Sequence, residues 1–148
     1  MRYICTIFVV LLFVNTSSAQ LQRFIHQTFT LDSANTFTID LYGAFVVEQW
    51  AGDALMIETQ VSLSDASEGI LNHFIKEGRY EIKAKLDGEI LTLFSKDKER
   101  RPIKTAKGER KEAVILRIFV PELWQAAGEN TWARPDALKK DFSAKGSG

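Results

Sequence analysis

The chain has 148 residues, and its 19 basic and 19 acidic side chains give a formal net charge of zero. This balance argues against a nucleic-acid-binding protein and against a strongly charged membrane-surface protein. The single cysteine, Cys5, lies in the N-terminal leader described next. The rest of the chain therefore offers no thiol for a disulfide, a nucleophile or a zinc ligand.

Residues 1–19 have the pattern of a secretory signal peptide, with a positive charge near the start and an apolar run from Ile4 to Val14. Ser17 and Ala19 have the small side chains that a signal peptidase accepts at its −3 and −1 sites. The apolar run is shorter than the ~20 residues that span a bilayer as a helix. We therefore expect export to the periplasm or the cell exterior, a mature chain from Gln20, and no transmembrane segment after cleavage.

Apolar and polar side chains alternate along much of residues 20–124, which is typical of half-buried β-strands. Turn residues at 51–53 and 87–88 separate some of these segments. We expect one mainly β domain over residues 20–124, an antiparallel β-sandwich or a β-solenoid-like domain, with a barrel also open. The expected strands are residues 24–31, 36–41, 45–48, 55–62, 80–86, 90–94 and 114–120.

One segment has helical spacing instead. Asp65 and Glu68 match a capping box, and apolar residues follow at the spacing of one helix face. Gly78 is a typical residue for the end of a helix. We expect one short helix at about residues 65–77 that covers an open end of the sheets.

Two segments are predicted to be loosely held. Residues 96–112 are rich in charge and poor in apolar side chains, which indicates a long solvated loop. The tail, residues 125–148, shows little periodicity, although Trp124 and Trp132 could hold part of it to the domain. Basic side chains of the charged loop could contact an anionic surface, but no aromatic residues interleave them as in a nucleic-acid platform. These candidate contacts are Arg100, Arg101, Lys104 and Lys107.

The search for catalytic, metal and cofactor sites finds none in the sequence. His26 and His73 do not form a metal-binding motif, and neither a nucleophile elbow nor a phosphate-binding loop is present. Carboxylate catalysis would require two acidic side chains from the strands to converge in a cleft. The alternating pattern predicts instead that they lie on solvated strand faces. These carboxylates are Asp40, Glu48, Glu58 and Glu81.

Trp50 is a further candidate surface contact, because it directly precedes the turn at residues 51–53. A tryptophan at a loop can contact a partner or fold back over the end of the core. The sequence leaves both possibilities open.

Residues 37–61 contain a strand, Gly43, a second strand, the turn Trp-Ala-Gly-Asp and a third strand. This order is similar to the opening of bacterial adhesin-like families, including the head-GIN-type domains common in Bacteroidetes. Residues 78–80 and 118–122 resemble later landmarks of the same families, so the resemblance covers roughly residues 28–124. It implies an exported cell-envelope protein with no known catalytic residues, whose strands continue into a single-stranded β-solenoid.

The chain departs from this pattern after Glu122, where no repeat of solenoid period follows. We therefore expect a form shortened before the solenoid rungs, with the strand Val114–Val120 left as an unpaired edge. Such an edge favours self-association or strand addition to a partner. The expected function is a non-catalytic interaction or structural module that binds a protein or envelope surface. The alternative is a carrier of a small apolar ligand, with a cavity lined by Phe45, Ile57 or Ile82.

Overall fold

The computed structural model describes residues 20–139, so the predicted leader at residues 1–19 lies outside the described residues. Within residues 20–139, eleven strands and one helix, α1 (Glu68–Lys76), are assigned. A further helical turn covers residues 135–139. The strands are β1 (Gln20–Phe29), β2 (Thr36–Asp40), β3 (Phe45–Trp50), β4 (Leu55–Ser64), β5 (Ile82–Asp87), β6 (Ile90–Ser95), β7 (Ile103–Thr105), β8 (Gly108–Arg110), β9 (Glu112–Pro121), β10 (Gln125–Gly128) and β11 (Thr131–Ala133).

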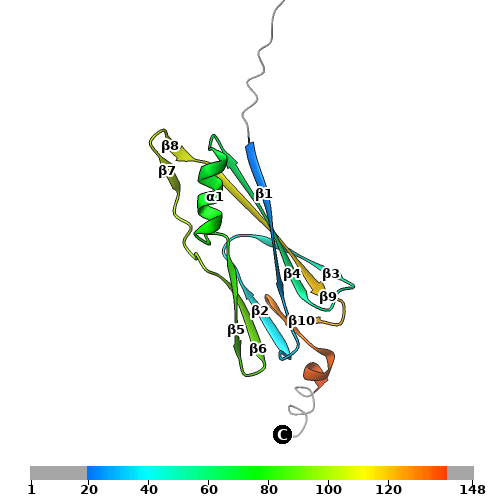
Figure 1. Ribbon diagram of the computed structural model, residues 1–148. Helices are drawn as coiled ribbons and strands as arrows, with labels where there is room; N and C mark the ends of the chain where they lie inside the picture. Colours follow the sequence, from blue (N-terminus) through cyan, green and yellow to red (C-terminus); the bar gives the residue numbers. More distant parts are fainter. Residues whose placement is uncertain (1–19, 140–148) are drawn as a thin grey trace, which may run out of the picture.

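The strands form two main sheets that pack as a sandwich, which confirms the mainly β prediction (Figure 1). The first sheet has the order β1-β4-β9-β3 and the second has the order β10-β11-β2-β6-β5. Most neighbouring strands are antiparallel, as expected, but β2 pairs with β6 and β3 pairs with β9 in parallel. Both main sheets are therefore mixed. Strands β7 and β8 form a separate hairpin.

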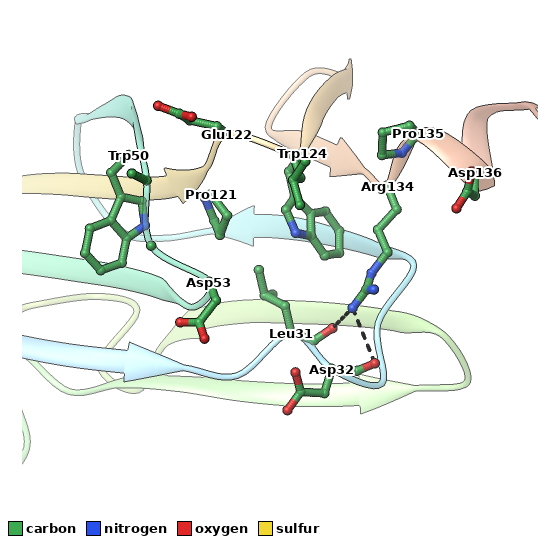
Figure 2. A pocket seen from close by; sticks show the side chains of 13 residues that line it. Leu31, Asp32, Trp50, Asp53, Pro121, Glu122, Trp124, Arg134, Pro135 and Asp136 are labelled. Carbon is green, nitrogen blue, oxygen red and sulfur yellow. Dashed lines mark hydrogen bonds between the residues drawn. The ribbon is translucent and has the colours of Figure 1, made fainter.

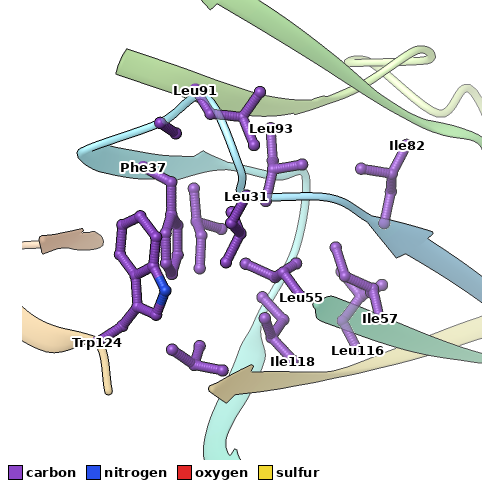
Figure 3. Packing of buried hydrophobic residues seen from close by; sticks show 13 residues of the cluster. Leu31, Phe37, Leu55, Ile57, Ile82, Leu91, Leu93, Leu116, Ile118 and Trp124 are labelled. Atoms are coloured by element: carbon purple, nitrogen blue, oxygen red, sulfur yellow. The ribbon is translucent and has the colours of Figure 1, made fainter. Parts of the chain in front are cut away.

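The main core lies between the two sheets and follows from the alternation of apolar side chains (Figure 3). In β2, β4 and β9 every second residue points into the sandwich, and the inward side chains are almost fully buried. Each strand contributes a row that meets the rows of the facing sheet. The buried residues of this cluster are Leu31, Ala34, Phe37, Ile39, Leu55, Ile57, Ile82, Leu91, Leu93, Leu116, Ile118, Val120 and Trp124.

The edge strands β1 and β5 are joined across one side of the sandwich by a side chain. The Gln27 amide nitrogen donates to the carbonyl oxygen of Ile82 at 2.9 Å, and the Ile82 N–H donates to the Gln27 amide oxygen at 2.9 Å. The amide thus satisfies the backbone groups that a neighbouring strand would otherwise bind.

Helix α1 confirms the predicted helix, although its N-cap is Ser67 rather than Asp65. The Ser67 hydroxyl accepts a hydrogen bond from the Ile70 N–H at 3.4 Å. Asp65 has a φ of 55°, whereas an N-cap residue has extended backbone. The helix buries Leu71 in a second cluster with Val61, Leu63, Tyr80 and Ile103, so it covers one end of the sandwich.

The prediction of an unpaired edge at residues 114–120 is wrong. Strand β9 pairs with β4 on one side and, from Leu116 onward, with β3 on the other. The edges of this sheet are β1 and β3. Self-association through the backbone of β9 is therefore blocked by its own neighbours.

The prediction of a loosely ordered tail is wrong for residues 125–133, which form β10 and β11. Strand β11 pairs with β2, in the second sheet. The Trp132 ring stacks on Phe37 with centroids 5.3 Å apart, and the Trp124 ring lies 5.1 Å from the same Phe37. The two tryptophans do hold this segment, and the domain therefore extends past residue 124.

Candidate functional site

The predicted basic contact surface is only partly present. Arg101, Lys104 and Lys107 are exposed on or next to the β7–β8 hairpin. Arg100, in contrast, is only 8% exposed, and its guanidinium lies 5.2 Å from the Tyr42 ring centroid and 5.6 Å from that of Tyr80. Aromatic faces attract a cation, and here they bury it. The prediction of one solvated loop over residues 96–112 is therefore wrong at Arg100 and Ile103, which are buried, and at β7 and β8, whereas most of the segment is exposed as predicted.

Arg100 lies beside a buried ion pair between Arg79 and Glu112. The Arg79 Nε and Nη2 donate to the two carboxylate oxygens of Glu112 at 2.9 and 2.8 Å, and Nη2 also donates to the Arg101 carbonyl oxygen at 2.8 Å. The Tyr80 hydroxyl donates to the same carboxylate at 2.7 Å. The side chains of Arg79 and Glu112 are 8% and 15% exposed. This cluster anchors the start of β9 beneath helix α1.

The cluster predicts how stability depends on pH. Burial acts to raise the pKa of Glu112, but hydrogen bonds from Arg79 and Tyr80 outweigh it and hold this pKa below its ordinary value of 4.5. Burial and the hydrogen bond to Glu112 raise the pKa of Tyr80 above its ordinary value of 10.0. The contribution of ionised Glu112 to stability is complete above about pH 4.5, and it is lost as the pH falls through the lowered pKa of the folded state. Stability from neutral Tyr80 is present below about pH 10 and is lost as the pH rises further.

We therefore expect the free energy of unfolding, measured by urea titration, to fall on the acidic side of about pH 4.5 and on the alkaline side of about pH 10. Glu112→Gln should flatten the acidic slope, and Tyr80→Phe should flatten the alkaline slope. Unchanged slopes in both variants would contradict this role of the cluster.

Each of the acidic residues considered for catalysis forms an ion pair with a basic side chain. Arg117 binds Glu48 at 3.0 Å and Glu58 at 3.2 Å on the outer face of the first sheet, and His26 also lies 3.0 Å from Glu58. The other two carboxylates are held separately: Asp40 by Lys98 at 3.0 Å and Glu81 by Lys96 at 2.9 Å. Only Glu48 and Glu58 meet, and they do so on a sheet face around a cation. His73 lies apart from them, on α1.

A groove of about 640 Å³, here called the end groove, lies where several loops meet at one end of the sandwich (Figure 2). Residues 31–32 come from the β1–β2 connection and residues 50–53 from the β3–β4 turn. Residues 121–124 join β9 to β10, and residues 134–136 follow β11. Loops placed on a rigid sheet scaffold are common positions for binding residues. The end groove is therefore the candidate functional site.

Trp50 forms one wall of the end groove and also packs against its own turn. Its indole N–H donates to the Ala54 carbonyl oxygen at 3.0 Å, and its ring lies 6.3 Å from Phe119. A Cβ atom at Gly52 would collide with the Trp50 ring, so only glycine permits this close packing. Trp50 therefore folds back onto its own turn and Phe119, outside the main core cluster, and the same ring lines the groove.

Arg134 holds the opposite wall in place. Its guanidinium donates hydrogen bonds to the carbonyl oxygens of Ala34, Leu31 and Asp32 over 2.9, 2.7 and 3.3 Å (Figure 2). It also lies 5.3 Å from the Trp124 ring centroid. The cation of Arg134 is thus engaged with backbone oxygens and an aromatic face.

Exposed carboxylates surround the end groove without intramolecular partners. Within residues 20–139, the Asp32, Asp53, Glu122 and Asp136 side chains form neither an ion pair nor a hydrogen bond. Leu123, 78% exposed, adds an apolar side chain at the same place. The groove lining thus combines apolar surface with a rim of carboxylates, an arrangement found at interaction sites.

Sequence reasoning singled out only Trp50 among the residues of the end groove. The others come from segments that are far apart in the chain, and acidic residues in separate loops carry no local pattern. The position of Leu123, two residues after the strand-ending Pro121, was the one local signal of an exposed apolar loop.

Comparison of the chain with protein families, with curated proteins and with solved structures finds no match. Among the residues that the structure describes, no helix is long and apolar enough to cross a membrane. In the same part of the chain, no three His, Cys, Asp or Glu side chains gather to hold a metal ion.

Proposed function

We propose that the protein is an exported cell-envelope module of the adhesin-like, head-GIN class that binds a protein partner without catalysing a reaction. The observation that carries the proposal is the end groove, in which exposed Leu123 lies beside free carboxylates. The resemblance at residues 37–61 also supports it. That stretch forms β2, β3 and β4, and the glycine between the first two of these strands, Gly43, has a φ of 95°.

The experiment compares two exposed leucines. A fully buried leucine contributes roughly 1.5–3 kcal/mol, so loss of Leu123 from an interface should weaken binding by roughly tenfold or more. We expect Leu123→Ser to weaken binding of the purified mature chain to isolated envelopes of the bacterium that encodes it by about that factor. Leu86→Ser is the matched control, because Leu86 is 46% exposed on β5 and does not line the end groove.

Export is tested in the same bacterium. The full chain with a C-terminal tag should be recovered outside the cytoplasm, and mass spectrometry should place its first residue near Gln20. Cytoplasmic recovery of the intact chain would overturn the proposed location. Equal binding by Leu123→Ser and Leu86→Ser would overturn the end groove as the binding site.

The carrier alternative receives less support from the packing. Ile57 and Ile82 are 0% and 2% exposed and lie within the main core, and Phe45 packs against the same cluster. The space that these side chains would line in a carrier is filled by other side chains (Figure 3). The end groove, in contrast, is lined by different residues.

A further inference from the structure

We infer that the end groove binds a lysine or arginine side chain of an extended, partly apolar segment of the partner protein. This inference rests on the proposed binding function and specifies the chemistry of its ligand. It follows from the charge and hydrogen-bonding character of the groove.

The charge of the end groove favours a cationic ligand. Among residues 20–139, Asp32, Asp53, Glu122 and Asp136 line the groove, and Arg134 is the only basic residue that does so. Figure 2 shows Asp32 and Asp53 on one side of the groove, Glu122 on the other side and Asp136 at one end. The Arg134 guanidinium donates to carbonyl oxygens and not to these carboxylates. Their negative charge is therefore left for a ligand to neutralise.

The free carboxylates of the end groove differ from four others in the fold. Glu48, Glu58, Glu81 and Glu112 each bind a cationic side chain of the same chain. Isolated exposed carboxylates are common on protein surfaces. Four of them around one apolar groove create a local negative potential that attracts cations and repels anions.

The hydrogen-bonding groups of the end groove also favour a ligand that only donates. Carboxylates only accept hydrogen bonds. The strong side-chain donors of the groove are already used: the Trp50 indole N–H binds the Ala54 carbonyl oxygen, and Arg134 binds the β1–β2 connection. The groove thus presents free acceptors to the ligand. A guanidinium or ammonium group supplies donors only, whereas a sugar needs both donors and acceptors.

The apolar surface of the groove also fits the side chain of a lysine or arginine. Leu31, Trp50, Pro121 and Leu123 line it together with the carboxylates. Lysine and arginine have long aliphatic stems that cover apolar surface while the charged head reaches polar groups. Arg134 already shows this arrangement within the chain, with its stem in the groove wall and its guanidinium over Trp124.

The decisive comparison uses isosteric neutral variants in the envelope-binding assay. The double variant Asp53→Asn with Glu122→Gln removes two charges without changing shape. We expect it to weaken envelope binding about tenfold or more at low salt, and we expect added salt to weaken binding of the unmodified chain, because exposed charges are screened. Glu109→Gln, an exposed carboxylate on β8 at the other end of the sandwich, is the control and should bind normally (Figure 1).

A random peptide library displayed on phage identifies the ligand chemistry independently. Selection on the full mature chain should enrich peptides with Lys or Arg between apolar residues. Replacement of that Arg by its neutral isostere citrulline should weaken binding at least about tenfold. Enrichment of acidic or neutral peptides, or equal affinity of the arginine and citrulline peptides, would overturn the inference.

Two further outcomes separate this inference from the proposed function. If Leu123→Ser loses envelope binding but the neutral double variant does not, the inferred cationic ligand is wrong and the proposed binding function still holds. If light scattering shows self-association that Lys104→Glu with Lys107→Glu abolishes, the groove is filled by the β7–β8 hairpin of a second copy. That result would also overturn the proposal that the partner is a different protein.

Discussion

Replacement of Glu112 by alanine is expected to lower the free energy of unfolding by about 3–5 kcal/mol, because it leaves the buried Arg79 guanidinium with only the more distant Asp97 carboxylate, at 3.6 Å, as a counter-ion. Arg79 would lose both hydrogen bonds to Glu112, and Tyr80 would lose its acceptor. Arg100 would then lie close to a second cation that has lost its main counter-ion. Urea denaturation followed by circular dichroism measures the change.

Glu48→Ala is the matched control for this prediction. Glu48 also forms a bidentate ion pair, with Arg117 at 3.0 and 3.1 Å, but both side chains are more than 40% exposed. An exposed pair contributes about 0–1 kcal/mol, so the control should lose far less stability. The double variant Arg79→Met with Glu112→Leu should also be less destabilised than Glu112→Ala, since it removes the buried Arg79 cation together with its counter-ion and leaves only Arg100 of the buried charges in this cluster. Losses of similar size for Glu112→Ala and Glu48→Ala would show that the buried cluster is not the anchor that its geometry indicates.

Replacement of Phe37 by alanine is expected to cost about 3–5 kcal/mol through the cavity that it leaves. The Phe37 ring is 0% exposed and lies against both Trp124 and Trp132. It therefore joins β2 to the segment that carries the end groove. Against a typical total stability of about 5–15 kcal/mol, the loss is a large share.

The Phe37 prediction has a spectroscopic readout besides stability. Loss of Phe37 should loosen Trp124 and Trp132, so the tryptophan emission of the folded protein should shift to longer wavelength. Phe24→Ala removes a phenylalanine that is 53% exposed on β1, and it should change stability by only about 0.5 kcal/mol. An unchanged emission spectrum in folded Phe37→Ala would contradict the role of Phe37 in holding residues 124–133.

The spacing of apolar side chains along the sequence explains which strands and helices could be predicted. Alternation along residues 36–41, 55–62 and 114–120 predicted strands because half-buried strands have a period of two. The switch to helical spacing after residue 68 predicted α1. The exact start was missed, because Ser67 and Asp65 are both capable caps and only the backbone conformation at Asp65 distinguishes them.

The corrected predictions share one physical cause, which is that neighbours in space were not neighbours in sequence. The charged segment around Arg100 has no apolar pattern, yet Tyr42 and Tyr80 from remote segments bury its guanidinium. The tail after residue 124 has little periodicity, yet its short strands are held by Phe37 and by the backbone of β2. Short segments of this kind owe their order to partners that local sequence does not reveal.

By itself, the sequence of this protein determined a mainly β domain, the inward face of most strands and the amphipathic helix α1, because each depends on the local periodicity of side chains. The tertiary structure alone decided that β9 is an interior strand and that two strand pairs are parallel. It alone brought the four loops of the end groove together. Strand order and loop convergence depend on contacts between distant segments, and side-chain periodicity carries no information about them.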